Sequence, residues 1–255
     1  MLALKFILAK IRTHEKLKNL QSAKVVKLRE GTGKGEGWET FIANTSGELL
    51  QYCQDAKITF KKHAELGWVP ELEHAEAAQP LIARMISLYM GANKNKGLTF
   101  NWLLDHIRDG QDKAYPRALV RLIEQAASKE VENPNADRDH LLHPTSVRRA
   151  IDEVSNMQVT QAISNEWPWL AGVKQRLNGE PVPMKRRDLE SFLRRDWDGQ
   201  WSSSKVRPPT DDPRSLVNYL VELGIIRERG EDRLDAPDLY QSGLGLKRKG
   251  GVRRY

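Results

Sequence analysis

The sequence has few of the features that mark a secreted or membrane protein. Its single cysteine, Cys53, excludes an internal disulfide and a zinc site built from thiolates. No stretch approaches the roughly 20 apolar residues needed to cross a bilayer, and Lys5 and Lys10 interrupt the apolar segment 1–11. We therefore expect a protein of the cytoplasm, with no membrane partner.

The chain also lacks the phosphate-binding loop of an NTPase. A Walker A loop has the pattern G-x-x-x-x-G-K-[ST], in which backbone amides and the lysine hold the phosphates and the hydroxyl holds magnesium. In the glycine-rich stretch 31–37, Lys34 is followed by Gly35, so the hydroxyl is missing. This stretch is interpreted as a flexible loop or hairpin. We expect no cofactor and no metal.

Basic residues outnumber acidic residues in this chain. The formal net charge of +7 and the pI of about 9.4 favour attraction to polyanions such as nucleic acid. The C-terminal segment 247–254 is basic without any acid, whereas residues 129–139 are mixed and mostly acidic. A basic tail of this kind either holds phosphates or is a solvated chain end.

The periodicity of apolar residues predicts a mainly α (α+β) protein. Helices are expected over 79–90, from Thr99 to the Asp109-Gly110 pair, from Pro116 and from Pro144. Strand-like runs at 38–44 and 56–60 favour a small sheet near the N-terminus. The expected units are an N-terminal α/β region of uncertain fold (1–70), a helical lid-like bundle (71–130), a linker and spine helix (131–165), a winged-helix domain (166–242) and a basic tail (243–255).

The C-terminal third predicts the element order of a winged helix. Helix, strand, helix, helix and hairpin are expected at 167–177, 181–183, 188–195, 213–223 and 225–236. Asp212 is a suitable N-cap for the third of these helices, and Pro213 suits its first position. The most specific sign is the run 220–226, which joins this helix directly to the first strand of the hairpin.

Sequence-specific reading of DNA looks weak, because the third helix offers only Arg214, Ser215 and Asn218 to base edges. Contacts with the phosphate backbone are expected instead. The alternative is a solvated basic face or a contact between domains. The candidate nucleic-acid-binding residues are Lys185, Arg186, Arg187, Arg194, Arg195, Lys205, Arg207, Arg214, Asn218, Arg227, Arg229, Arg233, Lys247, Arg248, Lys249, Arg253 and Arg254.

Several short motifs between residues 79 and 254 resemble the C-terminal half of bacterial P-loop ATPases of the AAA+ and STAND kind. In that family a helical lid is followed by a winged helix, and the resemblance implies the same here, without the Walker motifs. Members are often found in mobile-element and antiphage contexts. The motifs are Met90-Gly-Ala-Asn93, Phe100-Asn-Trp-Leu-Leu-Asp-His106, Tyr115-Pro-Arg-Ala-Leu119, Leu142-His-Pro-Thr-Ser146, Asp235-Ala-Pro-Asp-Leu-Tyr240 and Lys247-Arg-Lys-Gly-Gly251.

The Pro116-Arg117 pair resembles the second sensor of that family, whose guanidinium reaches the nucleotide phosphates from the lid. A planar cation that is always charged suits this role, and a surface arginine on a capped helix is the alternative. No hydrophobic strand ending in an Asp-Glu pair is visible upstream, so the magnesium site and activated water of an ATPase are not expected.

Three functions follow from these observations. The leading hypothesis is a non-catalytic adaptor that binds double-stranded DNA or a partner P-loop ATPase. The alternative is a subunit whose Arg117 completes the nucleotide site of such an ATPase. A hydrolase based on histidines is the third, but the sequence has no His-Glu-x-x-His pattern. Its candidate residues would be His63, His74, His106, His140 and His143.

Overall fold

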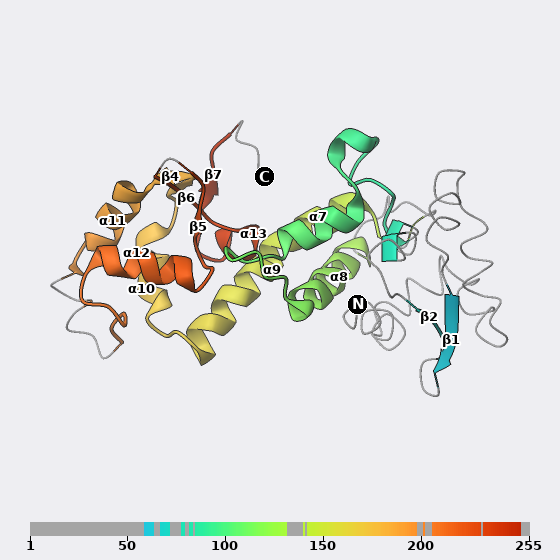
Figure 1. Ribbon diagram of the computed structural model, residues 1–255, viewed down its shortest axis with the longest axis horizontal. Helices are drawn as coiled ribbons and strands as arrows, with labels where there is room; N and C mark the ends of the chain where they lie inside the picture. Colours follow the sequence, from blue (N-terminus) through green and yellow to red (C-terminus); the bar gives the residue numbers. More distant parts are fainter. Residues whose placement is uncertain are drawn as a thin grey trace. The chain divides into compact units, whose positions relative to one another are not determined.

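The structure is a computed structural model that describes residues 59–63, 67–71, 78–79, 82–83, 85–131, 140, 142–197, 201, 206–230 and 232–250. The fold is mainly α (α+β), as predicted, with helices and a few short strands (Figure 1). The chain divides into two compact units. The first comprises residues 1–104 and 119–150, and the second comprises 105–118 and 151–255.

The first unit contains an antiparallel hairpin of β1 (Thr59–His63) and β2 (Gly67–Glu71), in which Thr59 pairs with Glu71 and His63 with Gly67. The predicted strand 56–60 overlaps the start of β1. The predicted strand 38–44 and the glycine-rich stretch 31–37 lie outside the described residues.

The predicted helix 79–90 is wrong at its C-terminal end. Helical residues are described only up to Met85, and the chain is no longer helical from Ile86. The reason is a competing pairing, because Tyr89 and Leu98 form an antiparallel bridge across a loop that contains the short 3-10 helix η2 (Lys94–Lys96). Helix α7 (Thr99–His106) begins directly after this bridge.

Two longer helices begin at the prolines that the sequence singles out. They are α8 (Pro116–Val131) and α9 (Pro144–Asn165). Proline suits the first helical position because it has no N–H group to leave unpaired there and its φ is already helical. The core of the first unit includes Ile86, Leu103, Leu122, Ile123 and Val147, all buried.

The second unit follows the predicted order of helix, strand, helix, helix and hairpin. Its described elements, beyond the ends of α7, α8 and α9, are α10 (Leu170–Leu177), β3 (Pro181–Val182), β4 (Met184–Lys185), α11 (Arg186–Arg194), α12 (Pro213–Glu222), β5 (Arg227–Glu228), β6 (Arg233–Asp235), α13 (Asp238–Gln241) and β7 (Lys247–Arg248). The strands β4, β6 and β5 form an antiparallel sheet in that order. β7 pairs in parallel with β3, so residues 247–248 of the predicted basic tail are a strand.

Helix α11 is the centre of the second unit, since it packs against α10, α12, β4 and β6 (Figure 1). The helices contribute fully buried leucines to this core, and the burial of each stabilises the fold by about 1.5–3 kcal/mol relative to exposure. The leucines are Leu170, Leu177, Leu189, Leu193, Leu216 and Leu220.

Asp212 caps α12 as predicted, because its Oδ1 accepts hydrogen bonds from the backbone amides of Arg214 and Ser215 at 2.9 and 3.0 Å.

Candidate nucleic-acid interface

The five residues 181–185 contain the two strands β3 and β4, and each of them pairs with a further strand. Their first part, β3, pairs with β7, and their last part, β4, pairs with β6. Helix α11 begins at the next residue, Arg186. Cations from distant parts of the sequence therefore meet along one short segment of chain.

Lys185 and Arg233 lie directly opposite each other on β4 and β6. Both side chains are exposed, and neither has an ion-pair partner in the described part of the chain. Residues opposite each other on antiparallel strands point to the same side of the sheet, and like charges in that position are destabilising. This pair therefore concentrates positive charge at a cost to the free energy of folding.

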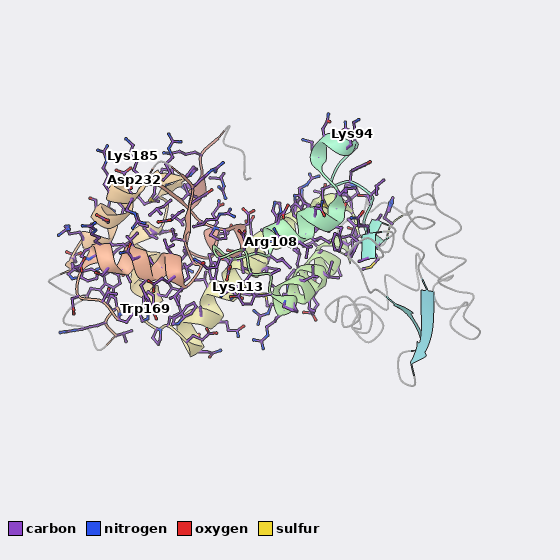
Figure 2. All side chains as sticks on the ribbon, viewed as in Figure 1. Lys94, Arg108, Lys113, Trp169, Lys185 and Asp232 are labelled. Carbon is purple, nitrogen blue, oxygen red and sulfur yellow. The ribbon has the colours of Figure 1, made fainter. Side chains whose placement is uncertain are left out.

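Further exposed cations extend this pair. Lys247 lies on β7 opposite Pro181, Lys249 follows it, and Arg187 occupies the second position of α11. Arg187 is 74% exposed, with Asp188 at 3.7 Å. Figure 2 shows Lys185 beside Asp232 at the edge of this unit. We define Lys185, Arg187, Arg233, Lys247 and Lys249 as the strand-edge cluster.

Arg186 is different, because its guanidinium is already bound within the protein. It donates to Asn218 Oδ1 on α12 at 2.7 Å and to Glu228 Oε1 on β5 at 2.6 Å. Its Nε also lies 3.9 Å from Asp232 Oδ1. Both Arg186 and Asn218 are predicted to contact nucleic acid, and in the structure their side chains bond to each other and, through Glu228, link α11, α12 and the hairpin.

Arg248 is also engaged inside the protein. Its Nη1 lies 2.8 Å from both carboxylate oxygens of Asp235, and its Nη2 donates to Gln241 Oε1 at 2.6 Å and lies 3.4 Å from Asp238. Asp235 is 1% exposed and also accepts a 3.0 Å hydrogen bond from Arg229. We call Arg229, Asp235, Asp238, Gln241 and Arg248 the buried network, in which both arginines, predicted to contact nucleic acid, bind the Asp235 carboxylate.

The exposed face of α12 offers little to a DNA base. Arg214 is exposed, but Asn218 is occupied by Arg186, and the helix start carries Asp211 and Asp212. The hydrogen bond from the Ser215 hydroxyl, with those from the backbone amides, holds the pKa of Asp212 below its ordinary value, so this acid is charged at neutral pH. A negative charge at the end of the helix opposes insertion into a phosphate-lined groove.

The remaining predicted residues are scattered. Arg194, Arg195 and Arg207 are all exposed, and Arg195 also packs on the Phe192 ring with its Nη2 3.4 Å from Glu180. Arg227 lies 3.8 Å from Asp112. Lys205, Arg253 and Arg254 lie outside the described residues.

No family model, curated protein or solved structure matches this chain. The assignment of function therefore rests on the residues and their geometry.

Arg117, the residue that resembles a sensor, is the second residue of α8 and is exposed. No hydrogen bond or ion pair joins its side chain to another of the described residues. It belongs to the segment 105–118, which is part of the second unit.

Within that segment, a loop around Asp109 bonds to the rest of the second unit, and the sequence did not indicate this loop. Asp109 is 1% exposed, and its carboxylate accepts hydrogen bonds from the amides of Gln111 and Lys113 at 2.8 and 2.9 Å and from the Tyr115 hydroxyl at 2.8 Å. Burial and the bond to Asp109 raise the pKa of Tyr115, so its hydroxyl stays protonated and continues to donate. The Gly110 amide then bonds the Gly224 carbonyl at the end of α12 at 2.6 Å.

The histidines do not form a metal site among the described residues, where no group of three or more His, Cys, Asp or Glu residues is placed to hold a metal ion. His143 Nδ1 instead accepts a 3.1 Å hydrogen bond from the Thr145 amide, and the Nε2 of buried His106 lies 3.5 Å from Asp238. His74 and the side chain of His63 lie outside the described part. No described helix is both long and apolar enough to cross a bilayer.

Proposed function

We propose that this protein is a non-catalytic adaptor that binds double-stranded DNA through the strand-edge cluster. The order of helices and strands, with the sheet order β4-β6-β5, supports a winged-helix module as the framework. In this proposal β5, β6 and the turn between them are the wing.

The observation that carries the proposal is the facing pair Lys185 and Arg233. A protein that only folds gains nothing from two exposed like charges opposite each other, because they repel. A DNA backbone brings phosphates that neutralise both charges and releases counterions on binding.

Binding is expected to be independent of DNA sequence. DNA sequence is read by side chains that reach base edges. Asn218 is the best candidate on α12 for this role, but its amide oxygen already accepts a hydrogen bond from Arg186. Phosphate contacts from the strand-edge cluster carry no sequence information. The protein is therefore expected to bind unrelated duplexes with similar affinity.

The experiment is a salt series with a fluorescently labelled DNA duplex, read by anisotropy. The logarithm of the association constant should fall linearly with the logarithm of salt concentration, by about 0.9 for each phosphate contacted. Lys185→Glu should weaken binding about tenfold at low salt. Lys113→Glu is the control, because it changes the net charge equally on an exposed lysine outside the cluster (Figure 2).

Three results would contradict the proposal. These are an absence of binding at low salt, an affinity that does not fall as salt rises, and an equal loss in Lys185→Glu and Lys113→Glu. The last result would indicate a general attraction between a basic protein and DNA rather than a site.

A second candidate function is the completion of a partner ATPase's nucleotide site by Arg117. The observation that favours it is an exposed guanidinium without a partner among the described residues, at the first turn of a helix. A cation there is disfavoured by the helix dipole, so an external phosphate would stabilise it. In a reconstituted assembly with the partner, Arg117→Ala should reduce the ATPase rate, whereas an unchanged rate would exclude this role.

A further inference from the structure

The first unit carries a basic loop that the proposed site does not include. No Asp or Glu occurs between Glu76 and Asp105, although this stretch contains Arg84, Lys94 and Lys96. A protein with 34 acidic residues in 255 would ordinarily place several of them in a segment of this length. The lysines lie in an exposed loop, residues 91–97, at whose outer end Figure 2 shows Lys94.

The loop has a defined geometry, since hydrogen bonds hold both its base and its tip. At the base, the Met90 amide donates to Gly97 O at 3.1 Å and the Thr99 amide to Leu88 O at 3.0 Å. At the tip, Asn93 Oδ1 accepts from the Asn95 amide at 3.1 Å and so caps η2. Gly97 has φ of +79°, which a residue with a side chain rarely adopts.

A third cation converges on this loop from α9. Arg148 Nη2 donates to the Met90 carbonyl at the base of the loop. A Cβ placed on Gly91 would lie 2.6 Å from Lys96 Cγ and 3.6 Å from Arg148 Nη2, so both side chains cross the loop at this glycine. None of Lys94, Lys96 and Arg148 has an acidic partner in the described part of the chain.

We propose that the 91–97 loop, with Lys94, Lys96 and Arg148, is a second contact site for the phosphates of duplex DNA. This inference rests on the proposed function, because it assigns a second point of contact to the same ligand. Residues 92–97 are all exposed, so the site is open to solvent and suits an extended polyanion. A preorganised loop loses little conformational entropy when it binds, which favours affinity.

The test uses the full chain with the duplex and salt series described above. Lys94→Glu/Lys96→Glu should weaken binding at least tenfold at low salt and reduce the salt slope by about 2, because two phosphate contacts are lost. Lys113→Glu/Lys174→Glu is the control, with the same change of net charge at two lysines outside both sites, and should retain the slope. Lys174 is half-buried in the last turn of α10. The melting temperature of each variant is measured as well, to check that the variant is folded under the conditions of the binding experiment.

A second measurement does not depend on substitutions. Acetylation of lysines in the free and DNA-bound protein, read by mass spectrometry, should show protection of Lys94 and Lys96 and full reactivity of Lys113. Equal reactivity of Lys94 and Lys96 in the two states would overturn the inference.

The outcomes separate the two proposals. If the loop variant binds like the wild type while Lys185→Glu binds weakly, the inference is wrong and the proposed function stands. If the loop variant binds weakly while Lys185→Glu is unaffected, the loop is a contact site and the strand-edge cluster is not. If the wild type binds no DNA, both are overturned.

Discussion

The strand-edge cluster and the buried network show two uses of the same residue types within one unit. The side chain of Arg248 is 14% exposed and bonded to Asp235, whereas its neighbours Lys247 and Lys249 are exposed. Likewise, Arg186 is bound to Asn218 and Glu228, whereas Lys185 on one side and Arg187 on the other are exposed. Side chains on an extended chain alternate between two directions, so Arg248 reaches different surroundings from Lys247 and Lys249. Arg186 and Arg187 begin helix α11, where successive side chains point in different directions around the helix axis. Each basic run therefore contains an arginine that stabilises the fold through bonds within the protein, and neighbouring cations that face solvent.

The largest expected effect comes from removing the central arginine of the buried network. Arg248→Ala leaves Asp235 buried with one of its two arginines, and removing one partner of a buried ion pair is strongly destabilising. We expect a loss of about 3 kcal/mol in the free energy of unfolding, measured by urea denaturation. Arg233→Ala is the exposed control and should change stability by no more than about 0.5 kcal/mol. Equal losses in the two variants would abolish the distinction between the two regions.

Arg186→Ala should have an intermediate effect. The side chain of Arg186 is 23% exposed and its hydrogen bonds join α11 to α12 and β5. We expect a loss of about 1 kcal/mol, which thermal unfolding would detect. The neighbouring Arg187→Ala is the control and should leave the melting temperature nearly unchanged. A variant at Arg186 that unfolds like the wild type but binds DNA poorly would move this residue into the binding set.

A smaller effect of opposite sign is expected in the strand-edge cluster. Arg233→Glu replaces the repulsion across β4 and β6 with attraction to Lys185, so the protein should become more stable by about 0.5 kcal/mol while binding DNA less tightly. Lys185→Glu should act in the same way. The double variant Lys185→Glu/Arg233→Glu again places like charges opposite each other and should not retain the gain. Additive gains in a double-mutant cycle would contradict the facing geometry.

The smallest effect concerns an exposed acid that nevertheless acts in folding. Because the pKa of Asp212 is lower in the folded protein than its ordinary 3.8, its charge stabilises the fold above that pH. This contribution should disappear as the pH falls through the folded pKa. Asp212→Asn, which retains a capping oxygen without a charge, should flatten the dependence of melting temperature on pH in this acidic range. If the dependence of melting temperature on pH is the same in Asp212→Asn and the wild type, the charge of this exposed acid does not stabilise the fold.

The sequence predicted the starts of helices better than their ends. Pro116, Pro144 and the Asp212-Pro213 pair each mark a start that the structure confirms, because capping and the fixed φ of proline are local effects. The helix expected to reach Met90 ends near Met85 because Tyr89 pairs with Leu98, nine residues further along. Periodicity within a helix contains no information about such a pairing.

The sequence predicted which cations belong to the candidate site, but not how they are arranged in space. The sequence indicated that cations gather near 185–187 and 247–249, but only the pairings of β3 with β7 and β4 with β6 bring these groups to one segment. Nothing local to Arg248 distinguishes it from Lys247, since its burial depends on Asp235 and Gln241 across the unit. The 91–97 loop lies between the predicted helix 79–90 and the predicted helix from Thr99 and was not among the predicted site residues, although its freedom from acids is visible in the sequence.

The segment 105–118 has a consequence for how this protein evolves. It lies in the second unit, although the residues on both sides of it, up to 104 and from 119, lie in the first. A gene fragment encoding residues 151–255 alone would lack Asp109 and Gly110, and so the loop that bonds the end of α12 at Gly224. A contiguous gene fragment that encodes the whole C-terminal unit must therefore also encode residues 119–150 of the first unit.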